Sequence, residues 1–166
     1  MKRTLGITHC AIFTAIGSML LTFGYYLQLA EFFWFFAATV CVIFAVEKCG
    51  VSFGLMTAIC ICVCVGILNG FNYIYLFPFV TFMCWHPILN KVFEKKTKSI
   101  QTIGFVLKLI WFYLDIWLML KFTALLLPIL FLPNLVQLVF YMFVPVLFWL
   151  YDHGINVLHQ KIKTIC

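Results

Sequence analysis

The chain has 166 residues, of which 66% are hydrophobic and only 10% are charged, with a formal net charge of +6. Soluble domains carry about 25% charged residues, and a globule of this length could not bury so much apolar surface. The composition therefore excludes a soluble enzyme, a nucleic-acid-binding domain and a disordered regulator. It predicts an all-α bundle surrounded by lipid, because a closed helical bundle satisfies the backbone in a bilayer.

Apolar runs divide the chain into six predicted transmembrane helices. A helix needs about 20 apolar residues to cross the hydrocarbon core. Six segments approach this length and make up one integral-membrane domain over residues 1–166. They are 5–26, 30–46, 51–68, 73–89, 103–127 and 134–151. The breaks between them contain Gly50, Gly70 and Pro133, which are typical turn residues.

The residues after Tyr151 form a different kind of segment. Ile155, Leu158, Ile162 and Ile165 recur at helical spacing among polar residues. This pattern predicts a short amphipathic helix that lies in the cytoplasmic membrane interface. The alternative is a frayed polar end of the sixth span.

Basic residues indicate the orientation of the spans. Nine of the eleven Lys and Arg residues lie outside the six spans, and all nine fall on one side of the membrane. They are Lys2, Arg3, Lys48, Lys91, Lys95, Lys96, Lys98, Lys161 and Lys163. The three loops on the other side contain no Lys or Arg. This positive-inside pattern predicts that both termini are cytoplasmic.

Charged residues inside a span are costly and therefore informative. Lys108 and Asp115 lie on nearly the same face of the fifth span, but about 10 Å apart along its axis. A direct ion pair between them is too long, so we expect a bridging group or water. Asp152, at the inner end of the sixth span, is a predicted partner of Lys108. The three residues form either a buried structural network or, through Asp115, part of a polar cavity or ligand site.

Polar residues also gather at the predicted outer side, among several aromatic residues. Convergent polar groups in an aromatic wall are typical of a small-ligand pocket. The alternative is an interfacial aromatic belt with solvated helix ends. The predicted ligand-binding residues are Glu31, Asn72, Tyr73, Lys121, Asn134 and Gln137.

Catalytic and metal-binding signatures are missing from the sequence. Cys60, Cys62 and Cys64 resemble a metal motif, but successive members point to nearly opposite sides of a helix. Small buried hydrophobes are the simpler interpretation of these cysteines. The chain has no nucleophile motif, no Walker loop and no dinucleotide fingerprint. We therefore expect no enzymatic activity, no cofactor and no metal.

The first span contains Ala11 and Ala15, two small residues four positions apart. Such spacing lets another helix approach closely in lipid. Ala11 and Ala15 are therefore predicted to dock a separate membrane subunit, with packing inside the bundle as the alternative.

With these residues the chain resembles the S components of energy-coupling-factor transporters. The small-x-x-x-small motif of their first helix is matched by Ala-Ile-Phe-Thr-Ala at 11–15, and size, span count and orientation match along the chain. The stretches 85–91 and 148–152 resemble a family of small S-component-like membrane proteins of Gram-positive bacteria. The resemblance implies a bacterial plasma-membrane protein that captures a vitamin-like molecule from outside. It also implies a transmembrane coupling subunit and separate ATPases as partners. The rival hypothesis is a non-catalytic scaffold or assembly protein of the cell envelope.

Overall fold

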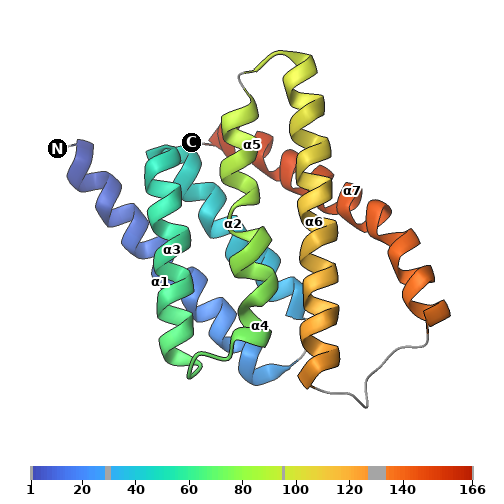
Figure 1. Cartoon of the computed structure of the whole chain (residues 1–166). Helices are drawn as coiled ribbons and strands as arrows, with labels where there is room; N and C mark the ends of the chain where they lie inside the picture. Colours follow the sequence, from blue (N-terminus) through green and yellow to red (C-terminus); the bar gives the residue numbers. More distant parts are fainter. Residues whose placement is uncertain (1, 29–30, 95, 127–133, 166) are drawn as a thin grey trace.

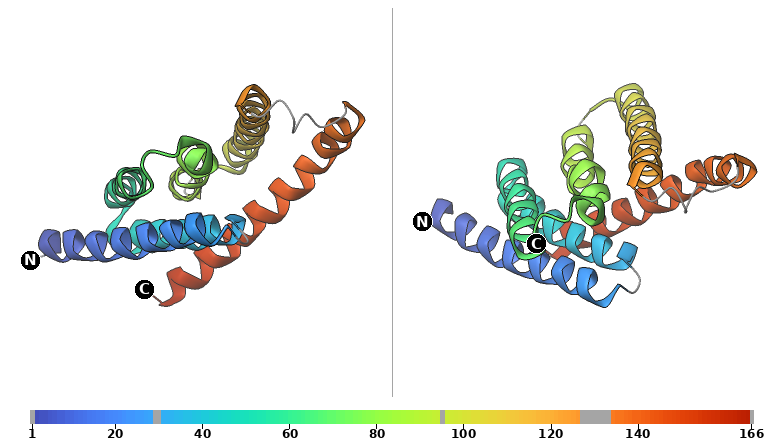
Figure 2. Two further views of the ribbon diagram at one scale, coloured as in Figure 1. Left: turned by 90° about the horizontal axis from the view of Figure 1, so that it is seen from below. Right: turned by 60° about the horizontal axis from the view of Figure 1, so that its bottom comes forward.

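The computed structural model describes residues 2–28, 31–94, 96–126 and 134–165, and these residues form helices without any strand. The elements are α1 (Lys2–Leu27), α2 (Glu31–Cys49), α3 (Val51–Leu68), α4 (Tyr73–Pro78), the π-helical segment η1 (Phe79–Met83), α5 (His86–Glu94), α6 (Lys98–Leu126) and α7 (Asn134–Ile165). Figure 2 shows α3, the α4–α5 segment and α6 side by side in one layer, with α1, α2 and α7 in another.

Four of the described helices are long and apolar enough to cross a membrane. They are Thr4–Leu27, Glu31–Cys49, Val51–Leu68 and Ile100–Lys121. They overlap the first, second, third and fifth predicted spans, so the chain is compatible with a multi-pass membrane protein. The starts of α1, α3 and α6 and the ends of α2, α5 and α7 lie toward the upper end of the bundle in Figure 1. We call this the basic end, because Lys48, Lys91, Lys98 and Lys163 belong to these helix ends.

The fourth predicted span, 73–89, is not one continuous helix. It consists of α4, the π-helical η1 and α5, with a turn between the last two. The Cys84 amide donates to the Phe79 carbonyl oxygen at 3.0 Å, which is an i to i−5 hydrogen bond. Pro78 lies at the start of this irregular region and supplies no amide donor of its own. Pro87 lies in the first turn of α5, where the missing donor is tolerated.

The predicted interfacial helix after Tyr151 is wrong as a separate element, because α7 continues unbroken to Ile165 (Figure 1). Its 32 residues make a helix about 48 Å long. Ile155 is 0% exposed and Ile162 is 3% exposed, and both pack with Ile43 of α2. The apolar spacing therefore reflects packing of α7 against α2 inside the protein. The sequence predicted instead that these residues face the membrane surface.

The main core lies where the two layers meet. Val42 of α2, Ile61 of α3, Phe79 of η1 and Phe148 of α7 are all 0% exposed and belong to one apolar cluster. Each comes from a different element, so burial of these side chains ties both layers together. In lipid these side chains stabilise the bundle through van der Waals packing between helices rather than through transfer from water.

Candidate functional site

A buried polar network joins α5, α6 and α7, and we call it the inner network. The Lys108 Nζ donates to Asp152 Oδ1 at 2.7 Å and to Asn90 Oδ1 at 2.6 Å. Asn90 Nδ2 donates to Asn156 Oδ1 at 3.0 Å, and Asn156 Nδ2 donates to Asp152 Oδ2 at 2.9 Å. His86 Nε2 lies 2.9 Å from Asp152 Oδ1. The four residues Lys108, Asp152, Asn156 and Asn90 close a ring, so the buried charges are both paired and hydrogen-bonded.

Helical spacing explains how this network is positioned. His86 and Asn90 are four residues apart on α5, and Asp152 and Asn156 are four apart on α7, so each pair shares a helix face. Lys108 of α6 reaches between the two pairs. The sequence prediction included Lys108 and Asp152 but missed the other three. Their i, i+4 spacing was visible, although nothing in the sequence showed that the two helix faces meet.

Asp115 does not join the inner network. Its carboxylate contacts the Thr81 hydroxyl of η1, and that hydroxyl also lies 2.6 Å from the Phe77 carbonyl oxygen. Asp115 is 5% exposed, so it is buried beside the irregular part of the α4–α5 segment. The expected bridge between Lys108 and Asp115 is therefore absent from the described contacts, because Lys108 points to α5 and α7 while Asp115 points to η1.

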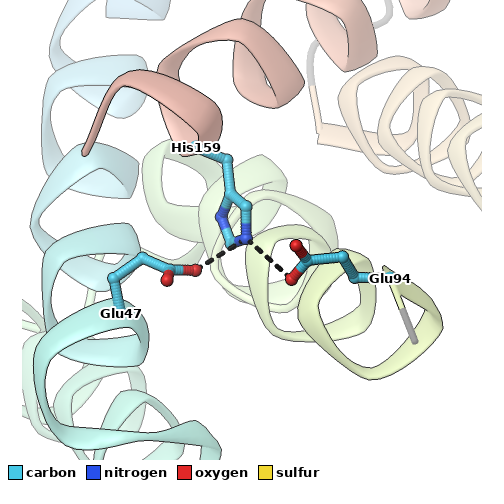
Figure 3. A group of neighbouring side chains, drawn as sticks. All are labelled: Glu47, Glu94 and His159. Atoms are coloured by element: carbon cyan, nitrogen blue, oxygen red, sulfur yellow. Dashed lines mark ion pairs between the residues drawn. The ribbon is translucent and has the colours of Figure 1, made fainter. Parts of the chain in front are cut away.

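A second polar cluster lies at the basic end and joins α2, α5 and α7. We call Glu47, Glu94 and His159 the Glu–Glu–His cluster (Figure 3). His159 Nε2 lies 2.6 Å from Glu47 Oε1 and 3.7 Å from Glu94 Oε2. One ligand atom from each residue lies within 4.8 Å of the others. Two carboxylates and an imidazole are suitable ligands for a divalent transition metal, so the charge of the surroundings must decide whether this is a metal site.

Two lysines already balance the carboxylates of this cluster. Lys91 Nζ lies 2.8 Å from Glu47 Oε2 and 3.2 Å from Glu94 Oε2. Lys163 Nζ lies 2.5 Å from Glu94 Oε1, and its hydrogen bond lowers the pKa of Glu94 to about 2. A divalent cation would repel both ammonium groups at short range. The arrangement therefore favours an ion-pair cluster that clamps α2, α5 and α7 together over a metal centre.

A polar cavity of about 340 Å³ lies between α5, α6 and α7. Its wall includes Asn90, Lys108, Asp152 and Asn156 of the inner network and also Glu94 and His159. The cavity thus connects the two polar clusters, and it lies toward the basic end of the bundle.

Of the six predicted outer residues, Glu31, Asn72 and Lys121 line neither this cavity nor the groove described below. Glu31 is exposed at the start of α2. Lys121 is exposed near the end of α6, where its Nζ lies 5.9 Å from the centre of the Trp117 ring. The side chains of Tyr73, Asn134 and Gln137 lie outside the described part of the structure.

Asn72 has a local structural role in the described contacts. Its Oδ1 accepts a hydrogen bond from the Tyr75 amide at 3.4 Å, so it caps the start of α4. Its Nδ2 donates to the Tyr25 hydroxyl at 3.3 Å, which links the end of α1 to this turn. Both polar atoms of the Asn72 side-chain amide, Oδ1 and Nδ2, therefore have partners within the chain.

An apolar groove of about 780 Å³ runs between α1 and α3, and we call it the α1/α3 groove. Ala11 and Ala15 line it, and both are exposed. Ser18 and Thr22 also line it, and their hydroxyl oxygens are buried without a hydrogen-bond partner among the described residues. Cys60 and Cys64 are among the α3 residues of the opposite wall.

Glycines, and not these alanines, provide the close packing of α1 inside the bundle. A Cβ atom on Gly17 would lie 2.6 Å from Ile61 Cδ1, and one on Gly24 would lie 2.7 Å from Trp34 Cβ. Real Cβ atoms do not approach so closely. The intramolecular contacts of α1 therefore use one set of small residues and leave Ala11 and Ala15 in the open groove.

No protein family model, no curated protein and no solved structure matches this chain. Its function is therefore inferred from the α1/α3 groove, the two polar clusters and the cavity.

Proposed function

We propose that the protein is a non-catalytic membrane subunit of the substrate-capture type, which docks on a separate membrane protein through the α1/α3 groove. One observation carries the proposal: Ala11 and Ala15 are exposed in an apolar groove, although the helix that bears them is long enough to span a bilayer. Energy for transport would come from ATPase subunits on other chains, in keeping with the missing Walker loop.

The groove has the chemistry that a transmembrane helix of a partner requires. Small side chains four residues apart allow two helix backbones to approach closely, which is how helices associate in lipid. Ser18 and Thr22 hydroxyls line the same groove without partners in the described chain. Both oxygens are buried within the chain, so a docking helix would contact the exposed Ala11 and Ala15 side chains rather than these hydroxyls. The resemblance to S components favours a coupling subunit over a second copy of this chain.

The test compares two double variants in the native membrane. Ala11→Leu with Ala15→Leu fills the groove, so the coupling subunit and its ATPases should no longer co-purify, while the thermal unfolding temperature stays unchanged. Ile12→Phe with Ile16→Phe adds bulk to exposed α1 residues outside the groove lining. This control should keep the partners.

The identity of the co-purifying proteins separates capture from the alternatives. A membrane protein together with ATP-hydrolysing subunits supports capture. Cell-envelope assembly proteins support the scaffold hypothesis instead, and a second copy of this chain indicates a dimer interface. If the groove-filling variant keeps the same partners as the original protein, the α1/α3 groove is not the docking site.

A further inference from the structure

The polar cavity between α5, α6 and α7 has walls whose formal charges are already compensated. Lys108 and Asp152 pair with each other inside the inner network. Glu94 is paired with Lys91 and Lys163 on the side of the Glu–Glu–His cluster. An ionic ligand would therefore meet no free counter-charge among these residues, and bringing it out of water would be costly. The charge balance favours a neutral ligand.

Amide and imidazole groups provide the remaining polar surface of the cavity. Gln101 and Gln160 line it from α6 and α7, and both side chains are exposed. The Gln101 amide already donates to the Glu94 and Lys96 carbonyl oxygens, at 3.2 and 3.1 Å. His159 is 6% exposed, and its Nδ1 is buried without a hydrogen-bond partner among the described residues. The buried Nδ1 lies beneath the surface of the cavity wall, so the exposed amide of Gln160 is the polar group that a ligand can reach.

Two aromatic side chains add flat apolar surface beside these polar groups. Phe93 of α5 and Phe105 of α6 both line the cavity. Gly104 lies next to them, and a Cβ atom there would be 3.1 Å from Phe93 Cγ. Gly104 thus lets the Phe93 ring lie close against α6. Aromatic rings favour offset or edge contacts with other planar rings, so the walls suit a planar molecule.

We propose that this cavity binds a neutral, planar heterocycle whose edges carry amide-like donors and acceptors. Its volume of about 340 Å³ lies at the lower end of the range of small-ligand pockets, about 300–1,000 Å³, and suits one or two fused rings. The cavity lies toward the basic end, opposite the predicted outer residues. Binding at this site rests on the cavity alone and is independent of the proposed function, which concerns the α1/α3 groove.

Isothermal titration calorimetry on the purified full chain in detergent tests the proposal. The probes are adenine, uracil and nicotinamide, which are neutral planar heterocycles. Benzoate serves as a planar anion and cyclohexanol as a non-planar neutral control. We expect at least one heterocycle to bind and both controls to fail. Gln160→Leu should weaken that binding about 10-fold through loss of one hydrogen-bonding group. His153→Leu, an exposed change on α7 outside the cavity lining, should not.

Three results would overturn the proposal. They are no binding of any heterocycle, equal binding of benzoate or cyclohexanol, and equal weakening by Gln160→Leu and His153→Leu. The variant Ala11→Leu with Ala15→Leu should bind the heterocycle as the original protein does. If the original protein binds no heterocycle but still co-purifies with its partners, the cavity proposal fails and the docking proposal stands. If it binds a heterocycle but has no partners that depend on the groove, the docking proposal fails and the cavity proposal stands.

Discussion

Lys108 Nζ lies 2.7 Å from Asp152 Oδ1, and this contact joins α6 to α7 across 44 positions of the chain. Lys108 is 8% exposed and Asp152 is 7% exposed, so water screens neither charge. Each residue is the principal counter-charge of the other, and the neighbouring Asn90 and Asn156 add one hydrogen bond to Lys108 and one to Asp152. This geometry makes the pair the natural target of a stability test.

Removing one member of the pair should destabilise the protein strongly. Lys108→Met leaves Asp152 buried without its ammonium partner, which typically costs about 3–5 kcal/mol. Adding Asp152→Asn removes the stranded charge and should restore much of the loss. Thermal unfolding in detergent measures both effects, with Lys161→Met as an exposed control. A double variant as unstable as Lys108→Met alone would contradict the pairing.

Asp115 should behave independently of Lys108. Asp115→Asn keeps an oxygen that can accept from Thr81, whereas Thr81→Val removes the hydroxyl and should cost about 1–3 kcal/mol. Lys108→Met should not rescue Asp115→Asn, because the two residues share no partner and their effects should add within about 0.5 kcal/mol. A double-mutant cycle of unfolding free energies checks this additivity. A large coupling energy would place both residues in one network.

Low pH should weaken the contact between Glu94 and Lys163. The hydrogen bond from Lys163 lowers the pKa of Glu94 from an ordinary 4.5 to about 2. Because the folded pKa is below the unfolded one, the stabilisation is complete above about pH 4.5 and is lost as the pH falls toward about 2. The unfolding temperature of Lys163→Met should therefore lie below that of the original protein at pH 7, and this difference should shrink across that interval. Lys161→Met should show no such trend.

Zinc should distinguish an ion-pair cluster from a metal site. In the original protein Lys91 lies between Glu47 and Glu94, so zinc should not raise the unfolding temperature. Lys91→Met removes this ammonium group and leaves the Glu–Glu–His cluster with excess negative charge. Zinc should then stabilise the variant. Stabilisation of the original protein by zinc would show that the metal displaces the lysine ammonium groups from the carboxylates.

The predicted six spans and cytoplasmic termini can be tested by labelling single cysteines in a cysteine-free background. Asn72 precedes α4 and Thr97 precedes α6, at opposite ends of the bundle (Figure 1). Asn72→Cys should react with an impermeant reagent added outside the cell, and Thr97→Cys should not. The reverse labelling pattern would invert the orientation and place the polar cavity at the outer side.

Helix content and helix length follow from local properties of the chain. An apolar run of sufficient length forms a helix in lipid whatever its neighbours are, so α1, α2, α3 and α6 lie close to the predicted spans. Breaks inside a helix are harder to predict. Pro78 was visible in the sequence, but the π-helical bonding of η1 depends on how the surrounding side chains pack. The C-terminal segment shows the same limit, since its spacing predicted a helix but not α2 as its partner.

The sequence by itself determined which buried charges need a partner, and the tertiary structure decided which groups are those partners. The cost of burying Lys108, Asp115 or Asp152 follows from residue type and position in an apolar run. The axial rise of a helix already excluded a direct contact between Lys108 and Asp115. Only the packing of α5 and α7 against α6 shows that Lys108 meets Asp152 and Asn90, while Asp115 meets Thr81. Ala11 and Ala15 follow the same rule: their spacing marks a close-packing surface, but only the placement of Gly17 and Gly24 toward the bundle leaves that surface open to a partner.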